Sequence, residues 1–302
     1  MKIPPFSPNP MTTPTPRERL TRRPEVVLFL FMLITVVVEM GRPALYSLGV
    51  SFLPPGAGYE QRLLVSLFAT TLTVAVVLIF CLVGERRTLA SLGLSRRGFP
   101  LEYPLGLVGG LALFGASVLL CVATGTLTLT ATGITSVGLW LLFIPGFLIQ
   151  GMSEELRCRS YLMVSLSRGF PLRACAGINA LLFSLLHMGN TGIGIISLIN
   201  IFLFGLFASL LALRRGSIWM VGGIHSAWNF AQGNLFGIPV SGIVAGPAPL
   251  SARVADGAFA GLWTGGSFGL EGGLAVTLIL ALACILALLI PSKSFGDKPS
   301  SV

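Results

Sequence analysis

Residues 193–235 have the sequence IGIISLINIFLFGLFASLLALRRGSIWMVGGIHSAWNFAQGNL. This stretch consists of two apolar runs, and only Arg214, Arg215 and Gly216 separate them. An apolar run of ~20 residues is long enough to cross the hydrocarbon core of a bilayer as a helix. A short basic turn between two such runs is typical of antiparallel membrane helices that are joined on the cytoplasmic side. The stretch therefore predicts a helical hairpin inside a membrane.

Runs of the same kind recur along the chain. Hydrophobic residues make up 54% of the 302 residues and charged residues only 10%, whereas a soluble domain carries about 25% charged residues. We therefore predict an all-α, polytopic membrane protein with about eight transmembrane helices and a water-accessible cavity between them. The eight apolar runs occupy residues 26–47, 63–83, 104–123, 136–153, 172–189, 193–213, 217–235 and 272–291.

Lysine and arginine residues gather in alternate connections between these runs. They are frequent in the two tails and in the second, fourth and sixth connections, and rare in the other connections. Such an alternation places the basic connections in the cytoplasm. We therefore expect a multi-pass protein of a bacterial plasma (inner) membrane, with both termini in the cytoplasm and membrane lipid around it. These connections explain the net charge of +9, and we expect no nucleic-acid partner.

Ionisable side chains inside the apolar runs are the candidates for chemistry, because charge at membrane depth is costly. The strongest candidates are Glu154, Glu155, Arg159, His187 and His225. A single histidine in an apolar helix is usually a packed, hydrogen-bonded residue. The chain has only two histidines, however, and both stand inside apolar runs, which favours an acid–base role near neutral pH.

Helical spacing predicts how these side chains group. Glu155 and Arg159 are four residues apart, so they share a helix face and form a pair, whereas Glu154 points toward a different neighbour. We expect the pair to hold Glu154 in place. His225 and Asn229 have the same spacing and project from one helix in the same direction.

The depth of two candidates follows from their distance to the expected hairpin turn at Phe170-Pro171. Glu154 precedes Phe170 by 16 residues (170 − 154), and His187 follows it by 17 (187 − 170). At ~1.5 Å per residue both lie about 24–26 Å from the turn, and antiparallel helices bring them level. Phe183 stands one turn before His187 and is expected to pack beside its ring.

Several protease mechanisms are excluded by the sequence. Its two aspartates, Asp256 and Asp297, lie in loop and tail segments, and neither an HExxH zinc motif nor a GxSG serine motif is present. What remains is a carboxylate and an imidazole that activate water, with Glu154 as the general base assisted by His187. Further hydrogen-bond donors on the next helix would stabilise the oxyanion that forms on a peptide carbonyl.

Three alternatives stay open on the residues alone. Glu154, His187 and His225 could supply three ligands of a catalytic zinc with an open fourth position. The same side chains could form the proton relay of a transporter, although the first three apolar runs carry almost no polar residues. The third alternative is a non-catalytic membrane scaffold. We expect an enzyme that uses neither a cofactor nor a metal.

Three short motifs on successive apolar runs resemble those of the CPBP family, also called Abi. This family contains the type II CAAX prenyl proteases and bacteriocin-processing enzymes, which are intramembrane glutamic endopeptidases. The resemblance covers about residues 138–230 and is specific, because all three motifs occur in order and include both histidines. The motifs are Glu154-Glu155-x-x-x-Arg159, Phe183-x-x-x-His187 and His225-x-x-x-Asn229.

The resemblance implies an activity and a role for each residue. It implies hydrolysis of a peptide bond in a membrane-presented protein or peptide, and in the prenyl proteases the last three residues after a lipidated cysteine are removed. It implies that Glu154 and His187 activate the water, while His225 and Asn229 form the oxyanion hole. A lipidated CAAX protein, a bacteriocin precursor and a membrane-anchored regulator are the alternative substrates. Ser160 departs from the family, since a glycine often follows the motif arginine, and it is expected to crowd the local packing.

Four further charged residues have plainer interpretations. Arg157 is expected to be a cytoplasmic anchor that extends toward the membrane surface. Glu39 and Arg42 are expected to form a local pair at the interface. Glu271 is expected to cap or orient the start of the last apolar run, with the lining of a gate as the alternative.

The expected organisation follows from these patterns and from the resemblance. The segments are a disordered basic cytoplasmic tail (1–25), N-terminal transmembrane helices (26–135), a catalytic core similar to the CPBP enzymes (136–235), an external Gly/Ala-rich loop (236–270), and a last transmembrane helix with a cytoplasmic tail (271–302).

Overall fold

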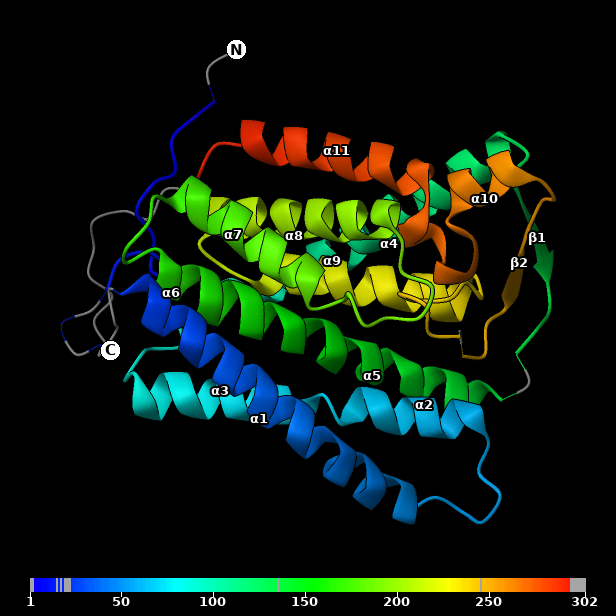
Figure 1. Ribbon diagram of the computed structural model, residues 1–302, viewed down its shortest axis with the longest axis horizontal. Helices are drawn as coiled ribbons and strands as arrows, with labels where there is room; N and C mark the ends of the chain where they lie inside the picture. Colours follow the sequence, from blue (N-terminus) through cyan, green and yellow to red (C-terminus); the bar gives the residue numbers. More distant parts are fainter. Residues whose placement is uncertain are drawn as a thin grey trace.

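The computed structural model of the protein describes residues 3–14, 16, 18, 23–134, 136–244 and 246–293. Most of the helices run along the long axis of the molecule, and a small two-stranded sheet lies at one end (Figure 1). This arrangement confirms the predicted all-α membrane architecture. The main helices are α1 (Pro24–Ser51), α2 (Tyr59–Phe68), α3 (Thr71–Ile79), α4 (Phe99–Ala123), α5 (Val137–Glu155), α6 (Val164–Leu166), α7 (Leu172–Leu185), α8 (Ile195–Arg215), α9 (Trp219–Phe230), α10 (Ala258–Thr264) and α11 (Leu274–Leu289).

Each of the eight predicted apolar runs coincides with helical structure. In the described part of the chain, five helical stretches are long and apolar enough to cross a bilayer by themselves. The helices α7, α9 and α11 have only 14, 12 and 16 residues, fewer than the ~20 that a span needs. Each of them packs against longer helices: α7 and α11 against α8, and α9 against α4 and α5. The five long stretches are Pro24–Ser51, Tyr59–Gly84, Phe99–Ala123, Val137–Leu166 and Ile195–Arg215.

The sheet was not predicted from the sequence. Its strands β1 (Leu127–Ala131) and β2 (Leu250–Val254) are antiparallel, with Leu127 opposite Val254. Alternating leucine and threonine residues in β1 favour a strand, but β1 is short and its partner lies far along the chain. Because β2 and α10 both fall within residues 236–270, the Gly/Ala-rich segment has more regular structure than the loop that we expected.

Glycines bring α9 into close contact with α4. Gly106 and Gly110 stand four residues apart on α4, and a methyl group at either would collide with a backbone carbonyl of α9. Gly223 on α9 meets the backbone of α4 in the same way. Small residues at this spacing let two membrane helices approach until their backbones touch. The packing fixes the position of α9, the helix that carries His225 and Asn229.

Residues 3–14, part of the segment that we expected to be a disordered tail, lie against the helices. Met11 is fully buried, and the side chain of Asn9 donates a hydrogen bond to a carbonyl of α8 (3.1 Å). Arg168 donates to two carbonyls of the same segment (2.5 and 3.2 Å). Buried guanidinium groups need such acceptors, and the tail supplies them. The rest of the predicted first tail at residues 1–2, 15, 17 and 19–22, and residues 294–302 of the last, lie outside the described residues.

Ser160 does not crowd its surroundings. The residue is fully buried, and its hydroxyl donates a hydrogen bond to the carbonyl of Leu92 (2.5 Å). Its own carbonyl accepts a hydrogen bond from Arg87 (2.8 Å). The serine therefore ties the helical segment after α5 to the connection between α3 and α4, where a glycine would leave the carbonyl of Leu92 without this donor.

Candidate active site

Glu154 and Glu155 are the last two residues of α5. The helix then widens into a π-helical segment over Leu156–Met163, and π-helical turns are frequent at functional sites. Arg159 lies in this segment, and its Nη1 is 3.1 Å from Oε1 of Glu155, with both side chains fully buried. The predicted pair is confirmed. The guanidinium of Arg159 also lies 4.3 Å from the centre of the Phe183 ring, so the pair links α5 to α7.

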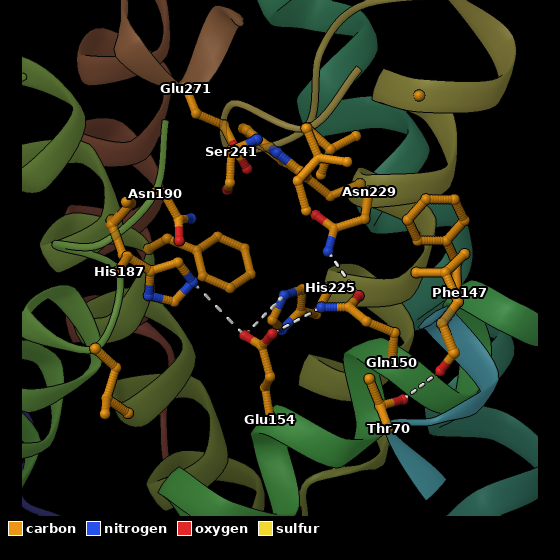
Figure 2. A pocket seen from close by; sticks show the side chains of 18 of the residues that line it. Thr70, Phe147, Gln150, Glu154, His187, Asn190, His225, Asn229, Ser241 and Glu271 are labelled. Atoms are coloured by element: carbon orange, nitrogen blue, oxygen red, sulfur yellow. Dashed lines mark hydrogen bonds and ion pairs between the residues drawn. The ribbon is translucent and has the colours of Figure 1, made fainter. Parts of the chain in front are cut away.

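The carboxylate of Glu154 faces both histidines of the chain (Figure 2). Its Oε2 is 3.7 Å from Nε2 of His225 and 3.9 Å from Nε2 of His187. Its Oε1 accepts a hydrogen bond from Nε2 of Gln150 (2.7 Å). The expectation that Glu154 and His187 lie at the same depth is confirmed, and three helices meet at this point.

The second nitrogen of each imidazole is held by an acceptor. Nδ1 of His187 lies 2.8 Å from the carbonyl oxygen of Phe183, and Nδ1 of His225 lies 2.8 Å from Oε1 of Glu155. A carbonyl or a carboxylate only accepts hydrogen bonds, so each Nδ1 carries a proton and each Nε2 is directed at Glu154. Phe183 packs beside the His187 ring at 4.8 Å between ring centres, as expected from their spacing.

Asn229 reaches the site through Gln150. Nδ2 of Asn229 donates to Oε1 of Gln150 (2.9 Å), while the amide of Gln150 donates to Glu154. The sequence reasoning missed Gln150. Its signal was present, because Gln150 precedes Glu154 by four residues on an otherwise apolar helix and shares its face. The glutamine joins the carboxylate to the asparagine on α9.

These side chains line a cavity of about 370 Å³. Glu154, His187, His225 and Asn229 all contribute to its wall, so the structure brings together the four residues that we selected from the sequence. Figure 2 shows their side chains directed toward one another from α5, α9 and the end of α7. Much of the remaining wall is apolar, with contributions from Leu63, Leu67, Phe147, Ile201, Phe204, Val276 and Leu280.

Glu271 lies at another side of the same cavity. Its Oε2 accepts hydrogen bonds from the backbone nitrogen (2.8 Å) and the hydroxyl (2.7 Å) of Ser241. Glu271 precedes α11, but no side-chain cap of that helix is found. Of the two interpretations from the sequence, the carboxylate therefore fits the lining of the cavity better than a helix cap.

Arg157 is not the surface anchor that we expected. Only 8% of the residue is exposed, and it lines the cavity. The predicted pair of Glu39 and Arg42 is confirmed at 3.2 Å, but Glu39 also faces Arg157 at 3.7 Å. The widened turn after Glu155 places Arg157 among the helices instead of at their outer surface.

The described residues contain no group of three His, Cys, Asp or Glu side chains arranged to hold a metal ion. The five cysteines are buried and free, and none of them lines the cavity. The result for metal ions covers Glu154, His187 and His225, the three residues that the sequence alone left open as zinc ligands.

Comparison with known families agrees with this geometry. Residues 136–231 match the model of the type II CAAX prenyl endopeptidase Rce1-like family. This segment of the chain is therefore similar to the Rce1-like family. The match confirms the resemblance to the CAAX proteases and shows that the protein is a membrane-embedded protease that hydrolyses a peptide bond. No curated protein matches the chain.

The Rce1-like segment contains all four residues at the centre of the cavity. It begins just before α5 and ends one residue after α9. A CAAX-type endopeptidase acts on a protein or peptide in a membrane environment, so the site must admit a polypeptide from the bilayer or its surface. Residues outside the segment, such as Leu67 and Glu271, complete the wall of the cavity.

Proposed function

We propose that this Rce1-like protein is a metal-independent glutamic endopeptidase. The observation that carries the proposal is the position of Glu154. Its Oε2 lies 3.7 Å from Nε2 of His225 on α9 and 3.9 Å from Nε2 of His187, which follows the end of α7. These distances are too long for direct hydrogen bonds, and polar groups at such a separation are commonly bridged by one water molecule. A water molecule at this position would contact Glu154, the proposed base, and a histidine nitrogen as a second acceptor.

In the proposed reaction Glu154 takes a proton from this water while the water oxygen bonds to the scissile carbonyl carbon. His187, with its proton on Nδ1, presents Nε2 as the second acceptor that orients the water. When the tetrahedral intermediate collapses, the C–N bond breaks and Glu154 returns the proton to the leaving nitrogen. The carboxylate is thereby restored for the next turnover.

The oxyanion is assigned to the amide of Asn229 and to His225. Nδ2 of Asn229 has two hydrogens, and Gln150 accepts only one of them, which leaves the other for the substrate oxygen. To donate from Nε2, His225 must be protonated on both nitrogens, and the carboxylate of Glu155 at 2.8 Å balances that charge. Donors placed in this way in a site without bulk water are worth ~3–4 kcal/mol each in the transition state.

The substrate is proposed to be a membrane-anchored protein or peptide, and a lipidated one is favoured by the cavity. Its wall combines the polar site with a broad apolar surface, which suits a lipid chain or an apolar side chain next to the scissile bond. The distribution of lysine and arginine supports an inner-membrane protein with both termini in the cytoplasm.

The proposal is tested by proteolysis of a farnesylated CAAX peptide and of membrane peptide extracts in liposomes. Glu154→Ala, Glu154→Gln and His187→Ala are compared with the wild type, with and without a metal chelator. We expect all three variants to lose nearly all activity and the chelator to leave the wild type unchanged. Equal activity of the variants would overturn the assignment, and inhibition by the chelator would favour the zinc enzyme with the same residues.

A further inference from the structure

A second polar cluster lines the same cavity as Glu154. It consists of Glu39 and Arg42 on α1 and Arg157 in the π-helical segment after α5. Oε2 of Glu39 is 3.2 Å from Nη1 of Arg42, and Oε1 of Glu39 is 3.7 Å from Nη1 of Arg157. Two guanidinium groups thus face the cavity with one carboxylate between them, which leaves a net positive charge.

Arg157 is poorly satisfied for a buried cation. The residue is 8% exposed, and its Nε is buried without a hydrogen-bond partner. Among the described residues its one ion pair within 4 Å is with Glu39, at 3.7 Å, while Glu154 acts on its charge from farther away. Arg159, two residues further, also has a buried Nε without a partner, but its other nitrogens have Glu155 at 3.1 Å and a backbone carbonyl at 3.4 Å. A buried guanidinium without acceptors is costly. A ligand with oxygen atoms would supply the acceptors that Arg157 lacks.

The position of Glu39 indicates which chemical group the two arginines would bind in a ligand. Its carboxylate already bridges the two arginines, but half of its side chain is exposed. An exposed ion pair of this kind contributes little to stability, so Glu39 is free to give way. A carboxylate from a ligand could then take its place and bind Arg157 through two parallel hydrogen bonds, the strongest geometry for this pair.

We propose that Arg157 and Arg42 bind the C-terminal carboxylate of the substrate, with Glu39 occupying that position in the free enzyme. This inference rests on the proposed function of Glu154. A CAAX motif stands at the end of its protein, so three residues separate the lipidated cysteine from the free carboxylate. An extended tripeptide spans ~10 Å. Arg157 follows Glu154 by three residues, ~4.5 Å of helix rise, and its long side chain covers the remaining distance.

The arginines of this cluster would then determine which peptide bond of the substrate is hydrolysed. With the last carboxylate held by Arg157, the enzyme measures a fixed length of chain back to the bond that Glu154 attacks. A peptide whose end is an amide, or whose chain continues past the motif, lacks the anchoring charge and binds more weakly. An anionic lipid headgroup presents similar oxygens, so the experiment must separate the two sources.

The test measures binding of a fluorescent farnesylated CAAX peptide, as the free acid or as the C-terminal amide, to the Glu154→Gln protein in nanodiscs of neutral phosphatidylcholine. We expect the acid to bind at least about tenfold more tightly than the amide, the ratio for one hydrogen-bonded charge. Adding Arg157→Gln should reduce the ratio to near one, and Arg157→Lys should keep part of it. Adding Glu39→Gln should raise the affinity for the acid.

Arg253→Gln in the same background is the matched control, because Arg253 lies on β2 and does not line the cavity; it should keep the full ratio. Arg42→Gln is the second variant in case Arg157→Gln does not fold, and it should lower the ratio partly. Equal affinity for acid and amide, no binding of either, or a ratio that survives in Arg157→Gln would each overturn the inference. An effect of Arg157→Gln seen only with anionic lipid would assign the cluster to a headgroup instead and overturn it too.

This result is independent of the test of Glu154, because it uses affinity and not turnover. If Glu154→Gln cleaves as fast as the wild type, the proposed mechanism fails, whereas the acid-to-amide ratio still reports on Arg157. If the ratio is one while Glu154→Gln is inactive, the carboxylate subsite fails and the mechanism stands.

Discussion

Each catalytic candidate in the cavity has a polar partner that fixes its orientation. The carbonyl of Phe183 orients His187, Glu155 orients His225, and Gln150 binds both Glu154 and Asn229. Such support fixes a reacting group within the tolerance that catalysis requires. Changes at these partners should therefore alter turnover more than substrate affinity.

Gln150→Leu tests the glutamine as a positioning residue. The leucine removes the hydrogen bonds to Glu154 and Asn229 at similar size, so we expect kcat to fall about tenfold or more, with a smaller change in KM. Gln150→Glu, which keeps an acceptor for Asn229 but not the donor to Glu154, should not restore the rate. Kinetics in liposomes check this, and a change in KM alone would contradict the positioning role.

Asn229→Ala tests the oxyanion assignment. The loss of one donor to the developing charge should lower kcat about 100- to 1,000-fold, because the interaction is made in the transition state. Steady-state kinetics separate kcat from KM. An equal loss in binding and turnover would mean that Asn229 holds the substrate and does not stabilise the oxyanion.

Glu155→Gln tests the buried pair. The substitution leaves Arg159 as an unpaired buried cation, and we expect a loss of ~3–5 kcal/mol in stability, measured by thermal inactivation. Exchanging the two charges by Glu155→Arg with Arg159→Glu should recover part of the stability but not the activity, since His225 also needs an acceptor from Glu155. Full recovery of activity in the exchanged protein would contradict that second role.

At the residue scale, the sequence was sufficient to predict those contacts that depend on the spacing of residues along a helix. The Glu155–Arg159 pair and the common depth of Glu154 and His187 follow from helix geometry and were confirmed. Gln150 was missed because an amide carries no charge to mark it as costly in a membrane. The environment of Arg157 was missed because its direction depends on the widened turn after Glu155.

At the scale of elements, the close crossing of α4 and α9 determines where His225 and Asn229 stand. Every apolar run predicted a helix correctly. The π-helical segment after α5 and the β1–β2 sheet were not predicted, since both depend on contacts with distant parts of the chain. A π-helical turn needs packing that favours an extra residue, and a five-residue strand needs its partner.

Gly106→Ala and Gly115→Ala test this crossing on one helix. A methyl group at Gly106 meets the backbone of α9, whereas nothing lies within 4 Å of one at Gly115. We expect Gly106→Ala to lose about 1–3 kcal/mol and much of its activity, measured by thermal inactivation and peptide cleavage. Gly115→Ala should match the wild type. Equal behaviour of the two variants would refute the role of the glycine contact.

At the scale of the whole molecule, the Rce1-like segment contains the four proposed catalytic residues, and other parts of the chain complete the wall of the cavity. Helices α1 and α2 and residues after 236 close the cavity around Glu154. The family and the membrane location were predictable from motifs and composition. The shape of the cavity was not, because it arises where segments distant in sequence meet.

The central claim is that Glu154 activates a water molecule that attacks the peptide carbonyl directly. A single turnover of a farnesylated CAAX peptide in H₂¹⁸O tests it, with mass spectrometry of the product and of the enzyme peptide that contains Glu154. We predict one ¹⁸O atom in the new carboxylate of the product and none in Glu154. An ¹⁸O atom in Glu154 would instead show that the carboxylate had attacked the substrate itself, and it would contradict the mechanism.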